Sequence, residues 1–390
     1  MWKSVAVALL IANDCLAGSE IPKDVKVSAA TRLDWEFAAS GFGPGAAKLP
    51  RDYDSTQQSY QLFVPKQYAK EKAWPLVVFI SPGDQPTGFS AWQKPCESRS
   101  MLFCSPYKAG NNCPPVQRVR IVLDMLDDVR RTYHIDPEQT YLAGFSGGGR
   151  MACAIGFALP EYFGGVIPVC GTNPLPRLTY LRHRIHDRLS VAFVTGTTDT
   201  LNRKENEEYM YPYFQELGIR TKLWVPAVGH ALPPASVVEE VHAWLAEDLK
   251  RRAKNAEDYP GLSVTAKTAP TAGEQARALL DTARADLKQP QRVWRGVTLL
   301  QGVTARWGTL EPGKEAKALL MKVSNDEELL KRISEQGEED EVRFLTAQAK
   351  AFERFGLTKQ AIAAWQLLAE NYADTPTGKK AATELKRLQK

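Results

Sequence analysis

The stretch that decides the fold is QTYLAGFSGGG, residues 139–149 of the 390-residue chain. A short β-prone run at residues 141–143 ends in Gly-x-Ser-x-Gly around Ser146, and a helix-forming stretch follows at residues 150–159. Strand, sharp turn and helix in this order are typical of a nucleophile elbow, whose strained serine needs small residues two positions to each side. Gly144 and Gly148 meet that need. The pattern predicts that Ser146 is presented as a nucleophile at the start of a helix.

Apolar strand-like runs alternate with helical runs from about residue 60 to residue 249. Strands are expected at residues 60–64, 76–80, 141–143, 165–169, 190–195 and 221–225, and helices at residues 116–133, 150–159, 205–217 and 235–249. Such alternation indicates an α/β fold, in which a mostly parallel sheet carries helices on both faces. The chemistry of such sheets lies at the carboxyl ends of the strands.

A serine nucleophile needs a base to take its proton and an acid to orient the base. Among five histidines, only His230 directly follows an expected strand and precedes an expected helix. Asp199 stands in the turn after the strand at residues 190–195, whereas its rivals Asp187 and Glu205 stand before that strand and within the next helix. We therefore expect Ser146 as nucleophile, His230 as base and Asp199 as the orienting acid, in the chain order serine, acid, histidine.

The negative charge of the reaction intermediate should be held by backbone N–H groups. The first donor expected is Gly147, directly after the nucleophile, and the second should come from the loop after residues 76–80, nominally Gly83 or Asp84. The chain has no metal-type Cys-x-x-Cys pair. Because this chemistry needs neither a metal nor a cofactor, we expect none.

Three stretches carry a resemblance to a known group: IDP at residues 135–137, YLAGFSGGGRMA at 141–152 and IPVCG at 167–171. The region around them resembles secreted α/β-hydrolase-fold esterases of the polyhydroxybutyrate depolymerase, feruloyl esterase and acetylxylan esterase type. The resemblance implies a doubly wound sheet and hydrolysis of an ester substrate, small or polymeric, through an acyl-Ser146 intermediate. The chain departs from the pattern at residues 81–84, Ser-Pro-Gly-Asp, where such esterases often carry His-Gly.

Two other functions are compatible with the sequence. A serine peptidase uses the same fold and the same residues, and nothing in the sequence excludes amide cleavage. A catalytically silent surface protein would keep the fold and bind a partner through its helical region. The complete set of Ser146, Asp199 and His230 argues against the silent protein, because a binding scaffold has no need of all three.

The chain divides into four expected parts. Residues 1–17 have a basic start, an apolar run and small residues before a cut, which indicates a signal peptide and a secreted or periplasmic protein. Residues 24–250 form the catalytic domain, residues 251–273 a charged, proline-containing linker, and residues 274–390 a helical domain. No later run reaches about 18 apolar residues, so no membrane span is expected once the signal is removed.

The helical domain repeats itself at an offset of 65 residues. Residues 307–320 match residues 372–385, and an offset of 65 is close to two helix-turn-helix units of about 34 residues. Residues 355–365 resemble the second helix of a tetratricopeptide repeat. We expect a tetratricopeptide-like domain that could bind a protein partner, with a plain helical bundle as the alternative.

Charge and cysteine usage add further expectations. A net charge of +5 gives no case for nucleic-acid binding. The basic stretch at residues 177–188 is interpreted as a solvated helix, the alternative being a cap that favours anionic esters. Cys96, Cys104 and Cys113 cluster in one loop-rich stretch where a disulfide is expected outside the cytoplasm, and Cys153 should pack as a small hydrophobe.

Overall fold

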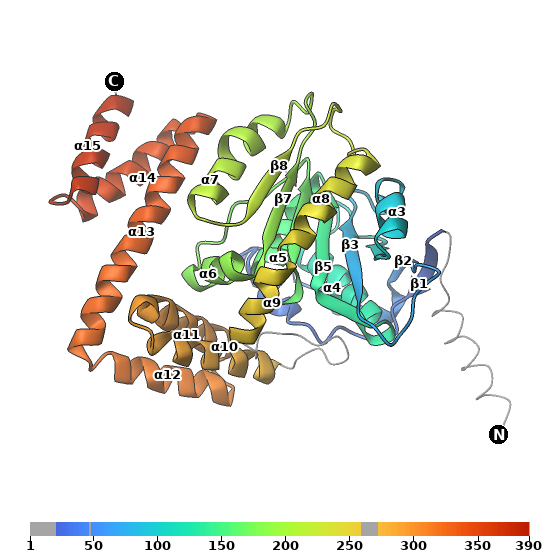
Figure 1. Ribbon diagram of the computed structural model, residues 1–390, viewed down its shortest axis with the longest axis horizontal. Helices are drawn as coiled ribbons and strands as arrows, with labels where there is room; N and C mark the ends of the chain where they lie inside the picture. The colour runs from blue at the N-terminus through green and yellow to red at the C-terminus, as the bar shows by residue number, and fades with distance from the viewer. Residues whose placement is uncertain (1–20, 47, 259–271, 390) are drawn as a thin grey trace.

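A computed structural model describes residues 21–46, 48–258 and 272–389 (Figure 1). The expected signal peptide and residues 259–271 of the expected linker lie outside these ranges. Eight strands form one sheet in the order β1-β2-β4-β3-β5-β6-β7-β8, in which β2 is antiparallel to β1 and β4 and the remaining pairs are parallel. The strands are β1 (Lys23–Lys26), β2 (Ser59–Phe63), β3 (Trp74–Ile80), β4 (Leu102–Pro106), β5 (Ile135–Phe145), β6 (Gly165–Val169), β7 (Ser190–Val194) and β8 (Thr221–Trp224). This doubly wound, mostly parallel sheet is the expected α/β-hydrolase fold.

Helices cover both faces of the sheet (Figure 1). One face carries α2 (Trp35–Ser40), α4 (Pro115–Thr132), α5 (Gly147–Ala158), α6 (Thr179–Arg188) and α7 (Tyr211–Glu216); the other carries α3 (Phe89–Ser98) and α8 (Ala235–Glu247). Successive strand residues point to opposite faces, so Val78 belongs to the first core and Val77 to the second. Helix α4 buries Val119, Val122 and Leu126, the apolar side that its spacing predicts.

The expected disulfide among the clustered cysteines is wrong. Cys96, Cys104 and Cys113 are free thiols, as are the other two cysteines in the described part of the chain. Cys96 lies on α3 and Cys104 on β4, a helix and a strand that the sequence interpretation treated as loop. These two thiols are buried in cores on opposite faces of the sheet, so they cannot meet.

Two further boundaries differ from expectation. The single helix expected at residues 205–217 is a π-helical segment, η3 (Glu205–Met210), followed by α7. Helix α9 (Leu249–Asp258) occupies the first part of the expected linker. Its Arg252 is fully buried and pairs with Asp248 at 3.0 Å and Glu138 at 3.4 Å. A charged run that reads as a solvated linker is therefore held against the sheet by buried ion pairs.

The C-terminal region is helical in its described part. Its α-helices are α10 (Ala272–Leu287), α11 (Val293–Trp307), α12 (Glu311–Val323), α13 (Glu327–Phe355), α14 (Thr358–Asn371) and α15 (Pro376–Leu388). Helices α14 and α15 begin 65 residues after α11 and α12. The same close approach also recurs, because a Cβ on Gly313 would meet the Trp307 carbonyl and one on Gly378 would meet the Tyr372 carbonyl. The tetratricopeptide assignment remains a prediction.

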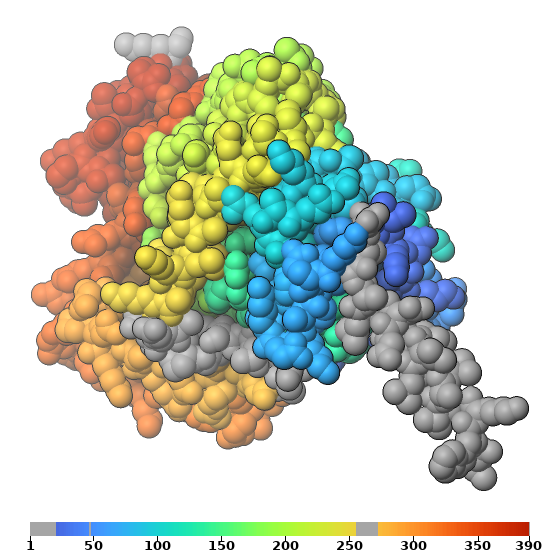
Figure 2. All heavy atoms as spheres, turned by 45° about the vertical axis from the view of Figure 1, so that its right-hand side comes forward, coloured from blue at the N-terminus to red at the C-terminus, as the bar shows by residue number. Residues whose placement is uncertain are grey.

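The helical region packs along one side of the catalytic domain, away from the N-terminal strands (Figures 1 and 2). Helix α6 lies between the two, and its Leu181 shares a core with α10 and α11. Arg184 and Arg188 of this helix are buried and pair with Glu161 and Glu138 at 3.2 Å and 2.6 Å. The interpretation of residues 177–188 as a solvated helix is therefore wrong, because the C-terminal helices cover it.

Of the helices in the described ranges, none combines the length and apolar character needed to span a bilayer.

Candidate active site

Parallel pairing brings the ends of five strands into one row. Gly144 of β5 pairs with Ile80 of β3, and the next residue, Phe145, pairs with Val169 of β6. Val169 in turn pairs with Val194 of β7, which pairs with Trp224 of β8. The loops after these strands therefore open at the same edge of the sheet, where the carboxyl ends of strands in such folds carry the chemistry.

Ser146 occupies the sharp turn between β5 and α5. Its backbone has φ 54° and ψ −121°, a region that residues with a side chain rarely adopt. The turn is tight because α5 crosses close to two strands: a Cβ on Gly144 would lie 2.3 Å from the Gly148 carbonyl oxygen, and one on Gly148 would lie 1.9 Å from that of Ile80. The two glycines are therefore required by close packing, as the elbow pattern predicts.

Three side chains, from the loops after β5, β7 and β8, form a continuous relay. His230 Nε2 lies 3.0 Å from the Ser146 hydroxyl oxygen, and His230 Nδ1 lies 3.2 Å from a carboxylate oxygen of Asp199. Asp199 is 1% exposed, whereas the His230 side chain is 31% exposed and Ser146 is partly exposed. The structure thus brings together the three residues that chain order had selected, with the acid buried and the nucleophile open to solvent.

Asp199 is held as an anion by the groups around it. The backbone N–H groups of Leu201 and Asn202 donate to its carboxylate at 3.1 Å and 3.2 Å. Burial alone would raise the pKa of Asp199, but hydrogen bonds from the Cys170 thiol, His230 and Asn202 lower it below its ordinary value. Burial, followed by the contact with Asp199, raises the pKa of Cys170 to about 12, so this thiol stays protonated, and it donates to the Ala231 carbonyl at 3.7 Å.

Two further side chains, those of Asn202 and Arg150, hold the acid in place. Asn202 Nδ2 lies 3.4 Å from both carboxylate oxygens of Asp199 and 3.3 Å from His230 Nδ1. The Asn202 amide oxygen accepts from Arg150 at 3.3 Å, and Arg150 pairs with Glu205 at 2.8 Å. Arg150 belongs to α5, the helix that starts at Ser146. The acid and the nucleophile are therefore connected through Asn202 and Arg150 as well as through His230.

The C-terminal region contacts the segment that carries this support. Tyr209 of η3 packs against Phe352 and Phe355 of α13, with ring centroids 5.5 Å and 5.6 Å apart. Arg354 of the same helix donates to the Glu208 carbonyl at 3.2 Å. The helical region thus lies against the segment that begins with Glu205.

The two places where oxyanion donors are expected, Gly147 and the loop at Gly83 and Asp84, differ in how their groups are engaged. The N–H of Gly147 follows Ser146 at the first turn of α5. The N–H of Gly83 donates to the Ser81 hydroxyl at 3.1 Å, and the Asp84 carboxylate accepts from the Gly110 N–H at 3.2 Å. The Gly83 N–H is therefore engaged within its own loop and the Asp84 carboxylate tethers the loop after β4, whereas the backbone N–H of Asp84 stays a predicted donor.

An unforeseen amide lies against Gly147. A Cβ on Gly147 would be 2.0 Å from the side-chain oxygen of Asn111 and 2.8 Å from its nitrogen. Arg118 of α4 donates to that oxygen at 3.2 Å, to the Gly147 carbonyl at 3.3 Å and to the Ser81 carbonyl at 2.9 Å. Because the guanidinium engages the Asn111 oxygen, the amide nitrogen is left as the donor. Burial lowers the pKa of Arg118 to about 10.

The other four histidines lie away from the relay. His134 bonds the Lys70 carbonyl at the start of β5, and His183 and His186 lie on α6. His242 lies inside α8, where its Nε2 accepts from the Trp92 indole at 3.0 Å, and burial lowers its pKa to about 3. The rival acids are also committed elsewhere: Glu205 pairs with Arg150, and Asp187 with Arg295.

The relay offers one grouping of potential metal ligands. Cys170, Asp199 and His230 place one donor atom each within 4.8 Å of the others. Hydrogen bonds explain this closeness: the Cys170 thiol donates to the Ala231 carbonyl at 3.7 Å, directly after His230, and the imidazole connects Asp199 to Ser146. The donor set therefore fits a proton relay.

Sequence reasoning missed Asn111, Arg118, Arg150, Cys170 and Asn202. Two of them left a usable signal. Arg150 stands about one helical turn after the nucleophile and Asn202 about one turn after the acid, and side chains three or four residues apart lie on the same side of a turn. Arg118 left none. An arginine on an amphipathic helix reads as a solvated side chain until the loop over it is placed.

Comparison with solved structures finds distant likenesses. A thermostable esterase is 22% identical over 52% of this chain and 62% of its own length, with a TM-score of 0.39. A ferulic acid esterase is 16% identical over 49% of this chain and 92% of its own, with a TM-score of 0.41. The fluorophosphonate-binding serine hydrolase F of Staphylococcus aureus is 10% identical over 58% of this chain and 98% of its own, with a TM-score of 0.41.

The chain thus spans less than two thirds of the length of the thermostable esterase. No protein-family model matches the chain, and no curated protein matches its sequence. Likenesses this distant add nothing to what the sheet topology and the relay geometry already show.

Proposed function

We propose that the protein is a serine hydrolase that cleaves carboxylic esters through an acyl-Ser146 intermediate. One observation carries the proposal: Ser146, on a strained elbow and open to solvent, is 3.0 Å from His230, which is 3.2 Å from the buried Asp199. A hydroxyl becomes a useful nucleophile when a positioned imidazole accepts its proton. A binding scaffold has no need of backbone strain at a serine that faces a base.

The reaction proceeds in two halves. Ser146 Oγ attacks the ester carbonyl carbon while His230 Nε2 takes the hydroxyl proton, and the same proton then passes to the leaving alkoxide as the carbon–oxygen bond breaks. Water next gives a proton to His230 and attacks the acyl carbon, and the proton returns to Ser146 as the acid is released. Asp199 accepts the His230 Nδ1–H throughout, so that Nε2 always faces the serine.

For the negative charge on the intermediate, we propose two donors of different kinds. The Gly147 N–H is the first, as the sequence predicts. The side-chain amide of Asn111 is the second, because it lies against Gly147 and its oxygen is engaged by Arg118, whereas the Gly83 N–H donates to Ser81. Arg118 acts as a positioning residue that joins the loops after β3 and β4 to the elbow.

We further propose that the protein works as a secreted or periplasmic enzyme and that its helical region binds a protein partner. The basic start and apolar run of residues 1–17 support export. The helix pairs that recur after 65 residues support a repeat surface. The ester is small or polymeric, and its identity is set by loops around the relay.

A kinetic experiment tests the proposed function. The full chain, Ser146→Ala and Ser334→Ala, whose serine is exposed on α13, are given p-nitrophenyl acetate, p-nitrophenyl butyrate and an alanine p-nitroanilide. We expect a burst of nitrophenol followed by steady turnover for the wild type and Ser334→Ala, and none for Ser146→Ala. Absence of ester turnover, or equal turnover by Ser146→Ala, would overturn the proposal. Anilide turnover exceeding ester turnover would make the protein a peptidase.

A further inference from the structure

The acid of the relay stands at the start of a helix that the C-terminal region contacts. Helical residues run without a break from residue 203 through η3 to the end of α7. The first of them, Arg203, donates its backbone N–H to the Asp199 carbonyl at 3.1 Å. The N–H groups of Leu201 and Asn202, directly before it, donate to the Asp199 carboxylate. The position of this helix therefore fixes the backbone that holds the acid.

Within that helix, η3 is wound as a π-helix, whose hydrogen bonds span one residue more than those of an α-helix. The N–H of Tyr211 accordingly donates to the carbonyl of Asn206, five residues back. Such insertions are rare and occur frequently at functional sites. Each residue of an α-helix adds about 100° of rotation, so a change from π-helical to α-helical winding would rotate one end of the helix against the other by about that angle. The winding of η3 thus decides how its two ends are directed.

The first turn of η3 is fixed by contacts inside the catalytic domain. Glu205 pairs with Arg150 of α5 at 2.8 Å, and Arg150 donates to the Asn202 amide oxygen at 3.3 Å. The buried Asn206 accepts from the Thr172 hydroxyl, in the loop after β6, at 2.8 Å. These bonds require one particular rotation of the turn, the one that directs both side chains toward the elbow helix and the loop beside it.

Helix α13 of the C-terminal region contacts the same segment from outside the active site. Its last residue, Phe355, stacks on Tyr209 with ring centroids 5.6 Å apart, and the Lys204 ammonium lies 5.9 Å from the same ring. Phe352 adds a second ring against Tyr209 at 5.5 Å. Lys204 stands directly before the π-helical segment and Tyr209 near its end, so Phe355 contacts both ends of it.

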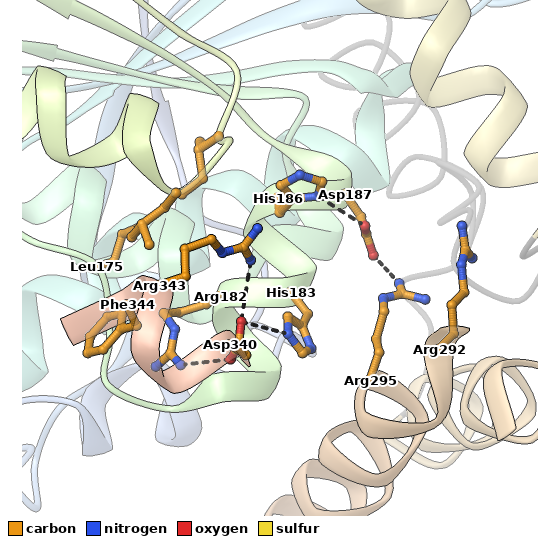
Figure 3. A pocket seen from close by; sticks show the side chains of 12 residues that line it. Leu175, Arg182, His183, His186, Asp187, Arg292, Arg295, Asp340, Arg343 and Phe344 are labelled. Atoms are coloured by element: carbon orange, nitrogen blue, oxygen red, sulfur yellow. Dashed lines mark hydrogen bonds and ion pairs between the residues drawn. The ribbon is translucent and has the colours of Figure 1, made fainter. Parts of the chain in front are cut away.

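Helix α13 is itself attached to the catalytic domain at a second place. Its Asp340 lies 3.4 Å from Arg182 and 3.8 Å from His183, both on α6 (Figure 3). Phe355 follows Asp340 on the same continuous helix by about 22 Å of axial rise. Two attachments this far apart fix the direction of α13 over the catalytic domain, and with it the position of the rings that cover η3.

We propose that α13 is a positioning element of the active site, which holds η3 in its π-helical winding and thereby keeps Glu205 and Asn202 in place beside Asp199. This inference rests on the proposed hydrolase function. When α13 releases η3, the helix relaxes to α-helical winding, the pair of Glu205 with Arg150 parts, and the acid loses its fixed orientation. The two windings are the discrete states that such coupling requires. The C-terminal region thus sets the turnover of the relay without contributing a group to it.

Steady-state kinetics with p-nitrophenyl butyrate on the full chain tests this role. Phe355→Leu removes the ring that contacts both ends of η3. The matched control, Phe344→Leu, removes a partly buried ring of the same helix that faces Arg182 of α6 and Tyr213 of α7 instead of η3. The number of active sites is counted by the nitrophenol burst, so that unfolded chains do not enter kcat. We expect kcat to fall about fivefold or more in Phe355→Leu, with KM within about twofold, and to stay within about twofold of wild type in Phe344→Leu.

Two further variants separate positioning from a loss of stability. Phe355→Tyr keeps the ring and should keep wild-type kcat. In a Glu205→Ala background, Phe355→Leu should have no further effect on kcat, because both changes act through the same pair of side chains. The proposal is overturned if Phe355→Leu and Phe344→Leu have equal kcat, or if the effects of Phe355→Leu and Glu205→Ala multiply in the double variant. A wild-type chain without ester turnover would overturn the proposed function, and this role with it.

Discussion

The edge of the sheet around Ser146 and the junction around Asp340 both concentrate polar side chains, but they are built in different ways. At the edge, each group faces a definite partner in a fixed order: hydroxyl, imidazole, carboxylate, amide and guanidinium. At the junction, the Asp340 carboxylate of α13 faces two guanidinium groups, those of Arg182 and Arg343, and the imidazole of His183. An ordered row can pass a proton between the serine and the imidazole, whereas a shared carboxylate suits holding two surfaces together.

The largest expected effect concerns the base at the edge. His230→Gln removes the imidazole that accepts the serine proton, so kcat for p-nitrophenyl butyrate should fall on the order of 10⁴-fold or more. His134→Gln, which alters a histidine bonded to the Lys70 carbonyl far along β5, should keep wild-type kcat. Steady-state kinetics measures both. Retention of a tenth of the activity by His230→Gln would show that the row is not a catalytic relay.

The next effect concerns the amide beside the elbow. Asn111→Ala should lower kcat about 10²-fold to 10³-fold with little change in KM, because an oxyanion donor acts only on the charge that develops in the transition state. Its neighbour Asn112 is exposed and serves as the matched control in Asn112→Ala. A change in KM with an unchanged kcat, or equal kinetics for the two variants, would show that Asn111 is not an oxyanion donor.

A smaller effect is expected behind the acid. Asn202→Ala removes the amide that contacts both Asp199 and His230, which should lower kcat about 10-fold to 10²-fold through loss of orientation. The acidic limb of the pH–kcat profile should move as well, a change that a merely structural residue would not cause. Asn371→Ala, at the exposed end of α14, provides the control. An unchanged profile in Asn202→Ala would make this amide structural.

The smallest expected effect concerns Asp340 at the junction and is a change in the thermal stability of the fold. The pKa of Asp340 in the folded protein is about 2, below its ordinary value of 3.8. Its ionised form therefore stabilises the fold by about 2 kcal/mol above about pH 4. This contribution is lost as the pH falls toward 2. Asp340→Asn should therefore lower Tm by a few degrees at pH 7, and the difference should shrink with acid. Calorimetry at pH 7 and pH 3 measures it, with Asp374→Asn as control. A difference that does not change with pH would contradict the shared carboxylate.

The contrast between edge and junction also explains what the sequence could predict. Ser146, Asp199 and His230 each follow a strand, so local pattern and chain order were enough to select three residues that the structure places in contact. The strand β6 has the bounds expected of it, Gly165–Val169, because a short apolar run between glycines has few alternatives. Features defined by the order of the chain are visible in the sequence.

Features defined by packing between distant elements were not visible. The basic run of α6 reads as solvated, but α11 covers it and Arg184 finds Glu161 from another segment. Strand β4 was missed because its residues 102–106 stand among cysteines and polar residues. Asn111 reaches Gly147 only because the loops after β3 and β4 are joined through Arg118. No spacing in the sequence encodes such approaches.

One measurement tests the central claim most directly. The full chain is treated with a fluorophosphonate, digested with a protease, and the modified peptide is identified by mass spectrometry. The account predicts one adduct per chain, on Ser146 within the peptide that contains residues 139–149, and no adduct in Ser146→Ala or after prior incubation with a slowly hydrolysed ester. An unlabelled chain, or a label on another serine that persists in Ser146→Ala, would contradict it.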